Sequence, residues 1–543
     1  MKVAELLVKC LENEGVDYIF GVPGEENVDV MDALHDSKIN FILTRHETSA
    51  AFMAGTYGRL TGKPGVCLAT LGPGATNLLT GVANANMDLS PIVAITGQAG
   101  LERQHKTSHQ YYDIVDIYKP VTKWNAQIKK GEIVPEVVRK AFQVATQDKS
   151  GATHIDLPED VAAMEVQGSP LPVIGHTMSE SDETVIEQAV KLIDYAKHPL
   201  ILAGNGITRD HAAEHLRTFV QKTNIPVVHS FMGKGAVPWT DEQSMLTAGM
   251  GGKDYITCGF NAADLIIAVG FDIAEYPPVN WNPEAKNSIL HIDTQEAETD
   301  SHYPVALNVI GDIKENLKKL TNALPAKPRS LEWINPVRQQ ALAELESFAN
   351  DLSYPVKPQK IISDLRSVLD DESIVLADVG AHKMWVARMF HTSQPNTCLI
   401  SNGLASMGVA VPGAIAAKMV YPNRNVVAIC GDGAFQMTSA ELETAMRLNL
   451  PIVILLWRDD GYGLIEWHQM KAFKRSTHIK FGNPDFVQLA QSYGFESRRV
   501  EKTEDLKPIL EWAIGLNKPV LIDCPVDYRE NMKLTEKLGN IEC

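Results

Sequence analysis

The sequence lacks the features that mark several classes of protein. No apolar run reaches the roughly 18 residues that a transmembrane helix needs. Lysine and arginine form no run, and 67 acidic against 50 basic residues give a net charge of −17. A chain of this charge is a poor partner for nucleic acid or an anionic membrane. It also has no low-complexity tract and no short-period repeat.

Cysteine is scarce as well. The seven cysteines lie far apart and form no CxxC motif; they are Cys10, Cys67, Cys258, Cys398, Cys430, Cys524 and Cys543. This spacing argues against a disulfide framework or a zinc site and predicts buried or incidental thiols. The amino terminus opens at once into an amphipathic pattern, without a basic and apolar leader or an Arg/Ser-rich transit segment. We therefore expect a protein of the reducing cytoplasm.

Short apolar runs that end in Gly or Asp recur along the chain and alternate with helical patterns. Such continuous apolar strands are typical of parallel sheets that helices cover on both faces. Proline- and glycine-containing stretches at 158–185 and 324–358 divide the runs into three groups. We predict an α/β fold of three doubly wound parallel-sheet domains, at 1–165, 185–325 and 355–543. A chain of 543 residues is long enough for three such cores.

The most informative segment lies in the third group. An apolar strand at 426–430 leads into Gly431-Asp432-Gly433, and a second, at 452–457, leads into Asp459. One βαβ crossover separates the two acids, so both carboxylates should emerge at the same edge of a parallel sheet. Two oxygen ligands beside glycine-exposed backbone amides suit Mg²⁺ that holds a diphosphate. A lone Gly-Asp-Gly is more often an ordinary turn, but the spacing and a second motif favour the functional interpretation.

The second motif, Arg45-His46-Glu47, begins where the strand at 41–43 ends. A glutamate at a strand-to-helix junction often does no more than start the helix. A catalytic carboxylate would need a dry pocket that raises its proton affinity. Gly72-Pro73-Gly74 and Gly21-Val22-Pro23-Gly24 end strands on the same face. The first of these lacks the Lys-Ser/Thr of a nucleotide-binding P-loop.

These stretches resemble thiamine-diphosphate (ThDP) enzymes, and in particular the catabolic, FAD-free acetolactate synthases of the acetohydroxyacid synthase superfamily. The likeness runs from Val3 to about Leu538, and it includes the stretches 379–385 and 459–462. It implies a fold of the thiamine-diphosphate-enzyme type, with ThDP and Mg²⁺ as cofactors. It also implies a homodimer or homotetramer with active sites at the subunit interface.

The resemblance implies roles for single residues. Glu47 would be the acid on the pyrimidine ring of ThDP, and Gln110 the substrate-facing amide, although Gln110 could also be a solvated loop residue. Asp432, Asp459 and the Gly461 carbonyl would hold the metal. The other expected cofactor contacts are Gly380, Ala381, His382, Ala405, Met407, Gly431, Gly433, Ala434, Tyr462, Gly463 and Leu464. The expected substrate pocket consists of Val22, Pro23, Gly24, Ile465 and His468.

Three places distinguish the members of this family. The loop from His105 to Gln110 lacks the adjacent histidines of simple 2-keto acid decarboxylases, which favours carboligation. The stretch 269–278 lacks the arginines of FAD-containing synthases, so FAD is expected to be absent. His468 stands where biosynthetic enzymes carry a Trp, which leaves the choice of acceptor open.

The implied activity is that of an acetolactate synthase. Pyruvate would be decarboxylated on ThDP, and the hydroxyethyl unit joined to a second pyruvate to give 2-acetolactate and CO₂. Another ThDP carboligase, with glyoxylate, sulfoacetaldehyde or an aldehyde as acceptor, is an alternative. So is a catalytically silent regulatory subunit, although the intact Glu47, Asp432 and Asp459 argue against it. Pyruvate, rather than nucleic acid or a membrane, is the expected partner.

Overall fold

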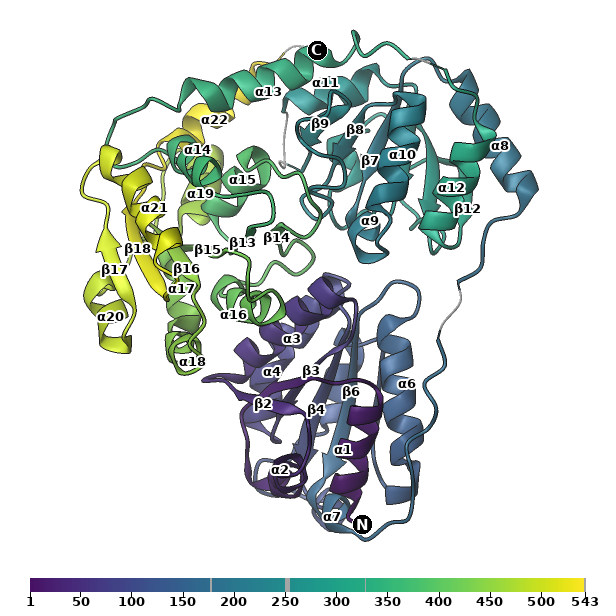
Figure 1. Cartoon of the computed structure of the whole chain (residues 1–543), viewed down its shortest axis with the longest axis vertical. Helices are drawn as coiled ribbons and strands as arrows, with labels where there is room; N and C mark the ends of the chain where they lie inside the picture. The colour runs from purple at the N-terminus through teal and green to yellow at the C-terminus, as the bar shows by residue number, and fades with distance from the viewer. Residues whose placement is uncertain (176–177, 250–253, 328, 542–543) are drawn as a thin grey trace. The chain divides into compact units, whose positions relative to one another are not determined.

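The computed structural model describes residues 1–175, 178–249, 254–327 and 329–541. Its strands form three six-stranded sheets, in which every strand pair is parallel (Figure 1). The prediction of an α/β fold with three parallel sheets is therefore confirmed. Each sheet packs against its own buried apolar cluster or clusters, as the continuous apolar runs indicated.

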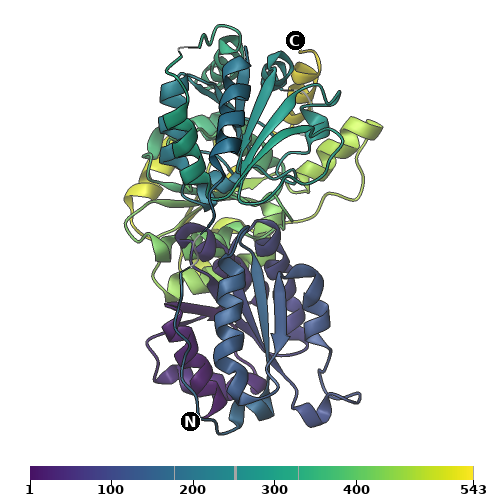
Figure 2. The same cartoon turned by 90° about the vertical axis from the view of Figure 1, so that its right-hand side faces the viewer.

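The first sheet has the strand order β2-β1-β3-β4-β6-β5. Helices α1, α2 and α6 pack on one face, and α3 and α4 lie on the other (Figures 1 and 2). Helix α3 begins after His46, whose side chain accepts a hydrogen bond from the N–H of Thr48, and it ends at Gly62 in the left-handed conformation. The strands are β1 Tyr18–Gly21, β2 Asn40–Leu43, β3 Gly65–Ala69, β4 Ile92–Gln98, β5 Trp124–Gln127 and β6 Ala152–Pro158; the helices are α1 Val3–Asn13, α2 Val28–His35, α3 Glu47–Thr61, α4 Pro73–Met87, α5 Ile114–Tyr118, α6 Val134–Thr146 and α7 Glu159–Ala163.

The second sheet has the strand order β12-β11-β10-β7-β8-β9. Helices α8, α10 and α12 cover one face, and α11 and α13 cover the other, each set with its own apolar cluster. In the second cluster the fully buried Trp281 packs against Phe260 and Phe271. The strands are β7 Pro199–Ala203, β8 Val227–His229, β9 Ser244–Thr247, β10 Leu265–Val269, β11 Ser288–Asp293 and β12 Val305–Ile310; the helices are α8 Glu183–Tyr195, α9 Asn205–Arg209, α10 Ala213–Thr223, α11 Tyr255–Ala262, α12 Ile313–Ala323 and α13 Asn335–Ser347.

The third sheet has the strand order β14-β13-β15-β16-β18-β17. Helices α14, α15, α21 and α22 share one apolar cluster with its strands. The strands are β13 Ile374–Ala377, β14 Cys398–Ile400, β15 Val426–Gly431, β16 Val453–Arg458, β17 Glu496–Arg499 and β18 Val520–Pro525; the helices are α14 Pro358–Val368, α15 Ala381–Met389, α16 Ala410–Val420, α17 Asp432–Thr438, α18 Leu442–Arg447, α19 Gly463–Phe473, α20 Phe486–Tyr493, α21 Leu506–Gly515 and α22 Glu530–Gly539.

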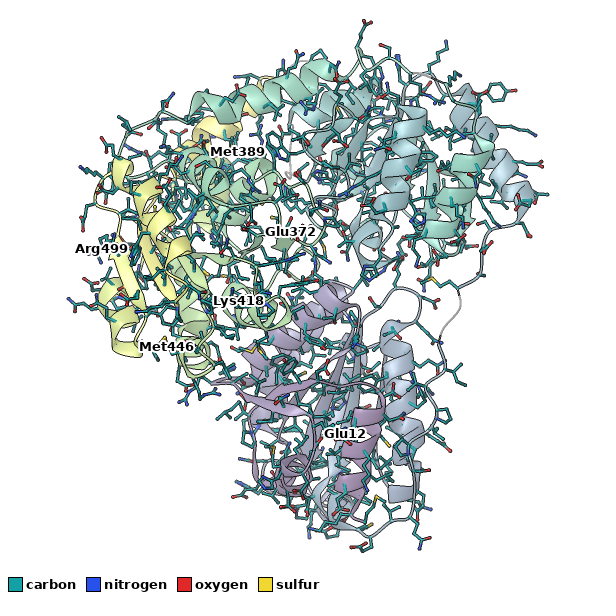
Figure 3. The ribbon with its side chains drawn as sticks, in the orientation of Figure 1. Glu12, Glu372, Met389, Lys418, Met446 and Arg499 are labelled. Atoms are coloured by element: carbon teal, nitrogen blue, oxygen red, sulfur yellow. The ribbon has the colours of Figure 1, made fainter. Side chains whose placement is uncertain are left out.

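By packing, the chain forms two compact units. The first comprises Met1–Thr177, Gly403–Asn423 and Gln436–Ile452, and the second comprises Met178–Asn402, Arg424–Phe435 and Val453–Cys543. The first unit therefore joins α16 and α18 to the first sheet, and α16 packs on α3. Figure 3 labels Lys418 in α16 and Met446 in α18.

The described residues bear on two further predictions. None of their helices is both long and apolar enough to cross a membrane. Five cysteines are free and buried, namely Cys10, Cys67, Cys398, Cys430 and Cys524. Cys258, in contrast, is disulfide-bonded, which the wide spacing of the cysteines did not predict.

Candidate active site

The predicted site residues divide between the two units. The first unit holds Val22, Pro23, Gly24, Glu47, Gln110, Ala405 and Met407. The second unit holds Gly380, Ala381, His382, Gly431, Asp432, Gly433, Ala434, Asp459, Gly461, Tyr462, Gly463, Leu464, Ile465 and His468. Each unit therefore carries one part of the predicted site.

The two predicted metal carboxylates follow neighbouring parallel strands. Strand β15 ends at Gly431, which pairs with Trp457 of β16. Asp432 follows the first strand directly, and Asp459 follows the second. Oδ2 of Asp432 accepts hydrogen bonds from the backbone N–H groups of Asp459 (3.3 Å) and Asp460 (2.7 Å). The sheet thus brings the two acids together in one turn.

Asp459 has a buried oxygen that accepts no hydrogen bond from the described residues. This atom is Oδ2, and the nearest cation, Lys480 Nζ, lies 3.9 Å away. Burial, and then the charge of Asp432, raise the pKa of Asp459 to about 8. Burial also raises the pKa of Asp432. Two such carboxylates side by side favour a bound cation, which would relieve both the desolvation and the repulsion.

The donor chemistry at this turn fits Mg²⁺. Among the described residues, no three His, Cys, Asp or Glu side chains are grouped so that they could hold a metal. A metal at Asp432 and Asp459 would therefore need further oxygens from the backbone, such as the Gly461 carbonyl, and from a bound anion. Mg²⁺ commonly binds in this way, through one or two carboxylates and the phosphates of a ligand.

The neighbouring Asp460 does not join the carboxylate pair. Its backbone has a φ of 55°, in the left-handed region that Asp tolerates better than most residues. Its side chain is half-exposed, and its Oδ2 lies 3.6 Å from Nη1 of Arg458. Asn483 donates hydrogen bonds to Asp432 Oδ2 (2.9 Å) and to Asp460 Oδ1 (2.8 Å). Asn483 therefore holds this turn, a role that the spacing of the motif did not predict.

The turn after β13 lies at the same sheet edge, because β13 pairs with β15. Gly380 precedes α15, and a Cβ at this position would lie 2.6 Å from the His382 ring. His382 is 2% exposed, and its Nε2 has no hydrogen-bond partner among the described residues. Burial lowers the pKa of His382 to about 3, so the imidazole is neutral. The glycine leaves room for this ring beside backbone N–H groups of the kind that bind phosphate.

The remaining predicted contacts of the second unit lie on or beside α17 and α19. Ala434 is buried in α17. The Tyr462 ring packs edge-on against Phe481, with 5.0 Å between ring centroids. Helix α19 contains no buried residue, Ile465 is 49% exposed, and His468 is exposed as well. The predicted pocket residues of α19 are therefore accessible at the surface of their unit.

In the first unit, Glu47 is the first residue of α3 and is partly buried. Asn77 Nδ2 donates a hydrogen bond to its Oε2 (3.1 Å). A Cβ at Gly74, near the start of α4, would lie 3.5 Å from its Oε1. Helices α3 and α4 therefore hold the Glu47 carboxylate between their first turns.

Gln110 lies near the start of the same helix α4. Its side chain is exposed, and its backbone has a φ of 56°. Gly72 has a φ of 53°, and a Cβ there would lie 2.7 Å from the carbonyl oxygen of Gln110. A glycine is thus required at 72 both by its backbone conformation and by the approach of the Gln110 loop.

The loop of Val22, Pro23 and Gly24 reaches the same place through Thr70. A Cβ at Gly24 would lie 2.4 Å from the Thr70 Cβ, and a Cβ at Gly74 would lie 2.9 Å from the Thr70 Cγ2. The first unit therefore gathers this loop, Glu47 and Gln110 around the start of α4.

Ala405 and Met407 lie in the loop that precedes α16. Asp88, at the end of α4, accepts a hydrogen bond from the backbone N–H of Gly403 (2.8 Å), which anchors this loop to the first sheet's helices. Ala405 has a φ of 56°, an uncommon conformation for a residue with a Cβ. Met407, in the same loop, is partly buried.

Glu441 was missed by the sequence analysis, and it holds the start of α3. It is fully buried at the end of the 3₁₀ turn Ser439–Glu441. Its Oε1 accepts hydrogen bonds from the backbone N–H groups of Arg45 (3.0 Å) and His46 (3.2 Å), directly before Glu47. The only available signal was a glutamate on the buried face of a helix, and its partners lie in a distant part of the sequence.

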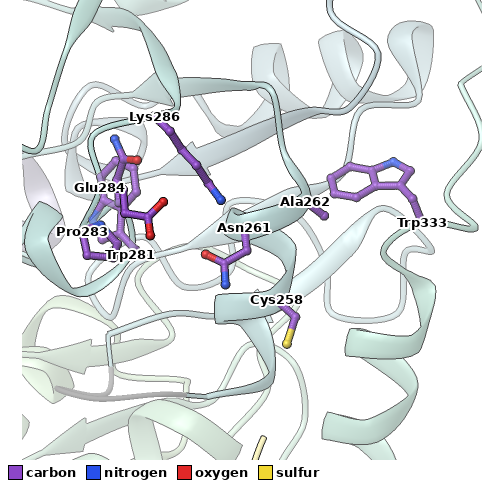
Figure 4. Close-up of a pocket in the computed structure, with 9 residues that line it drawn as sticks. Cys258, Asn261, Ala262, Trp281, Pro283, Glu284, Lys286 and Trp333 are labelled. Atoms are coloured by element: carbon purple, nitrogen blue, oxygen red, sulfur yellow. The ribbon is translucent and has the colours of Figure 1, made fainter. Parts of the chain in front are cut away.

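A pocket of about 590 Å³ beside the second sheet contains none of the predicted site residues (Figure 4). Its lining includes Trp281, Asn282, Lys286 and Trp333. Asn282, a buried polar side chain of this lining, already donates to the His302 carbonyl (2.9 Å). The Asn282 side chain therefore already has hydrogen-bond partners within the protein and is not left for a ligand in this pocket.

Three family models match the chain in sequence order. Residues 1–117 match the thiamine pyrophosphate enzyme N-terminal TPP binding domain. Residues 186–320 match the central domain of these enzymes, and residues 378–524 match their C-terminal TPP binding domain. The N-terminal match includes Glu47 and Gln110, and the C-terminal match includes Asp432 and Asp459.

Curated relatives match the chain over nearly its full length. The chain is 34% identical over 540 residues to an acetolactate synthase of Bacillus subtilis, with 98% of this chain and 94% of the relative covered. It is 36% identical to a probable acetolactate synthase large subunit of Methanococcus aeolicus, with 100% and 95% covered. It is 34% identical to a catabolic acetolactate synthase of Raoultella terrigena, with 98% and 97% covered.

Proposed function

Because this chain belongs to the acetolactate synthases among the thiamine pyrophosphate enzymes, we propose that it converts two molecules of pyruvate into 2-acetolactate and CO₂. The observation that carries this proposal is the carboxylate pair Asp432 and Asp459 at one sheet edge, where a buried oxygen of Asp459 accepts no hydrogen bond from any residue that the structure describes. A catalytically silent subunit would have no need for two buried carboxylates that favour a cation.

When bound, ThDP supplies the chemistry that removes CO₂ from one 2-keto acid and joins the remaining carbons to another. Asp432, Asp459 and the Gly461 carbonyl would hold Mg²⁺ at its diphosphate end. Glu47 would hold a proton at the pyrimidine ring nitrogen. Gln110 would donate a hydrogen bond to the pyruvate carboxylate or to its developing alkoxide.

We propose that the protein works without FAD. Gly204, Asn205 and the start of α9 form a turn that could receive the phosphates of a dinucleotide. The buried Glu275 occupies it: its two carboxylate oxygens accept the Asn205 N–H at 3.0 and 3.1 Å, and the Ser230 hydroxyl also donates to it. Burial, and then the nearby Asp272, raise the pKa of Glu275 to about 7. A phosphate would have to displace this group, so the turn does not fit a bound flavin dinucleotide.

We further propose a homodimer or homotetramer whose active sites lie at the subunit interface. The exposed α19 supports this proposal, since Phe473 is 71% exposed and Ile465 is 49% exposed. Apolar side chains exposed in this way are typical of surfaces that a partner covers. We also keep the cytoplasm as the proposed compartment, because five cysteines are free, buried thiols and outnumber the disulfide-bonded Cys258.

A pyruvate incubation tests the proposed activity. The purified protein should convert pyruvate to a product that yields acetoin after acid treatment, measured by a colour reaction. The signal should require both ThDP and a divalent metal, and an Asp432→Ala variant should lack it. Acetaldehyde without acetoin would identify a simple decarboxylase instead. A product formed only when glyoxylate, sulfoacetaldehyde or an aldehyde is added would identify another carboligase.

A further inference from the structure

The segment 99–113, which carries Gln110, is held in place by a buried polar network. This segment connects β4 to α5, and Gln110 lies near its end with a left-handed backbone. Such a conformation costs free energy in a residue other than glycine, so it persists only where the surroundings impose it. The contacts that impose it therefore help to determine where the Gln110 side chain lies.

Asp156 is at the centre of this network. It lies on β6 and is fully buried. Its Oδ1 accepts a hydrogen bond from the Thr96 hydroxyl (2.7 Å). Its Oδ2 accepts hydrogen bonds from Gln127 Nε2 (2.9 Å) and, at longer range, from Gln98 Nε2 (3.4 Å). All three donors are neutral, so the negative charge is stabilised by hydrogen bonds rather than by these partners' charge.

The two glutamines connect Asp156 to the segment on both sides of Gln110. Gln98 Nε2 donates to the Tyr112 carbonyl (3.1 Å), and Gln98 Oε1 accepts the Ala99 N–H (2.9 Å). Gln127 Nε2 also donates to Gln104 Oε1 (3.2 Å), and Gln104 in turn donates to the Ala99 carbonyl (2.7 Å). The network therefore fixes the segment at its start, near its middle and close to its end.

The residues after β6 hold the first part of the same segment. Glu159 accepts the Gly100 N–H (3.3 Å) and pairs with Arg103. Asp160 accepts the Leu101 N–H (3.0 Å). Three acids that follow one another along β6 and α7 thus serve the segment that carries Gln110.

An ionised carboxylate has an effect here that a neutral side chain would lack. A carboxylate only accepts hydrogen bonds, whereas the amide of a glutamine can turn over and exchange its donor for its acceptor. Asp156 therefore requires Gln98 and Gln127 to present their NH₂ groups to it. With that orientation fixed, Gln98 has a second N–H for Tyr112 and an oxygen for Ala99.

We propose that Asp156, through Gln98 and Gln127, is a positioning residue that sets the conformation of the Gln110 segment and thereby the handling of pyruvate. This inference rests on the proposed function, which places Gln110 at the substrate. Asp156 itself is not a catalytic residue, because it is enclosed by protein donors and acts through the segment.

Amide hydrogen exchange and kinetics of Asp156→Asn and Gln127→Leu test the inference. In both variants, exchange within 104–112 should accelerate, while the strands of the first sheet keep their protection. The KM for pyruvate should rise by about tenfold, the size expected when one hydrogen bond to a charged group is lost. The activation constant for ThDP should change by less than about twofold, since the cofactor contacts are untouched.

A matched control and a double variant complete the experiment. Thr153 is a buried polar residue on the same strand, and its hydroxyl donates hydrogen bonds to the carbonyls of Ile92 and Ala141, outside the Asp156 network. Thr153→Val should lower stability without altering exchange in 104–112 or the KM. The double variant Asp156→Asn/Gln127→Leu should be no worse than the more affected single variant, because both break one network.

The outcomes separate the inference from the proposed function. Unchanged exchange in 104–112 for both single variants would overturn the inference, whether or not the protein turns over pyruvate. Faster exchange with unchanged kinetics would also overturn it, since the segment would then not govern substrate handling. Wild-type protein that forms no acetolactate, together with faster exchange in the variants, would reject the proposed function and retain only the structural role of Asp156.

Discussion

Glu47 lies at the start of α3, where we propose that it holds a proton. It is partly buried and accepts a hydrogen bond from Asn77 at 3.1 Å. Glu47→Gln keeps the side-chain size but cannot hold an acidic proton. We expect turnover to fall by about 10²–10⁴-fold, the usual worth of general acid–base catalysis, with folding and ThDP binding retained. Initial rates at saturating ThDP measure the effect, and a rate near that of the wild type would reject the role.

Substitution of Asp459 tests whether this residue is a metal ligand or only part of a turn. Asp459→Ala removes an oxygen ligand, so the affinities for Mg²⁺ and ThDP should fall together, because the metal would join the carboxylates to the diphosphate. Asp459→Asn should be milder, since it keeps an oxygen of the same reach. Calorimetric titration of ThDP with and without Mg²⁺ measures both. Asp460→Asn is the matched control, since the Asp460 side chain points to Arg458 and Asn483.

Among single residues, the sequence predicted those that lie next to strand ends. Asp432 and Asp459 could be placed together because one crossover connects two continuous apolar strands. The partners of these residues could not be predicted in the same way. Asn483 and Glu441 are distant in sequence from the groups that they hold, so only the folded chain brings them near.

Among the elements, the buried central strands were predicted and some edge strands were not. β15 and β16 are continuous apolar runs, whereas β17 reads Glu-Ser-Arg-Arg and resembles a solvated loop. Its Arg499, marked in Figure 3, donates to Asp523 of β18 at 2.6 Å. An edge strand of this kind depends on its neighbour rather than on its own hydrophobic pattern, so periodicity cannot reveal it.

The contact between the 3₁₀ turn at Glu441 and the start of α3 can be tested by substitution of Glu441. Glu441→Ala removes the acceptor of two N–H groups directly before Glu47. We expect a loss of about 1–3 kcal/mol in unfolding free energy and a fall in kcat beyond the effect on stability. Urea unfolding and rates at saturating pyruvate measure the two quantities. Glu441→Gln, which keeps an acceptor oxygen, should recover most of both.

The control for this prediction lies on the adjacent helix. Glu443 forms an i,i+4 pair with Arg447 at 2.9 Å and is partly exposed. Because such exposed pairs contribute little, Glu443→Ala should leave kcat almost unchanged. A fall in kcat as large as that of Glu441→Ala would show that the turn is generally sensitive rather than specifically held by Glu441.

The turn before α9 carries the prediction about flavin. Glu275 accepts the backbone N–H of Asn205, which a dinucleotide phosphate at this turn would need, so purified protein should be colourless and its activity independent of added FAD. Absorbance in the near-ultraviolet and blue visible range, beyond the protein band, measures bound flavin. Flavin that copurifies in equal amount with the protein would contradict this prediction and the assignment to the FAD-free branch.

The whole molecule divides the predicted site between two packing units, with Glu47 in the first and Asp459 in the second. Three sheets were foreseen from the three groups of apolar strands. The membership of α16 and α18 in the first unit was not, because it depends on contacts of α16 with α3 that local patterns do not encode. A substitution at Glu47 and a substitution at Asp459 therefore fall in separate units.

Active sites that form between subunits would allow two inactive variants to complement each other. In a heterodimer of Glu47→Gln and Asp459→Ala, one interface site would receive both intact residues and the other would receive both lesions. Heterodimers purified through two different tags should therefore show about half of the wild-type rate, because a symmetric dimer has two equivalent sites. Each variant carrying both tags on its own chains serves as the control and should remain inactive. If Glu47 and Asp459 of one chain instead served the same site, every site in the heterodimer would carry one lesion, and the absence of any recovery would reject the interface arrangement.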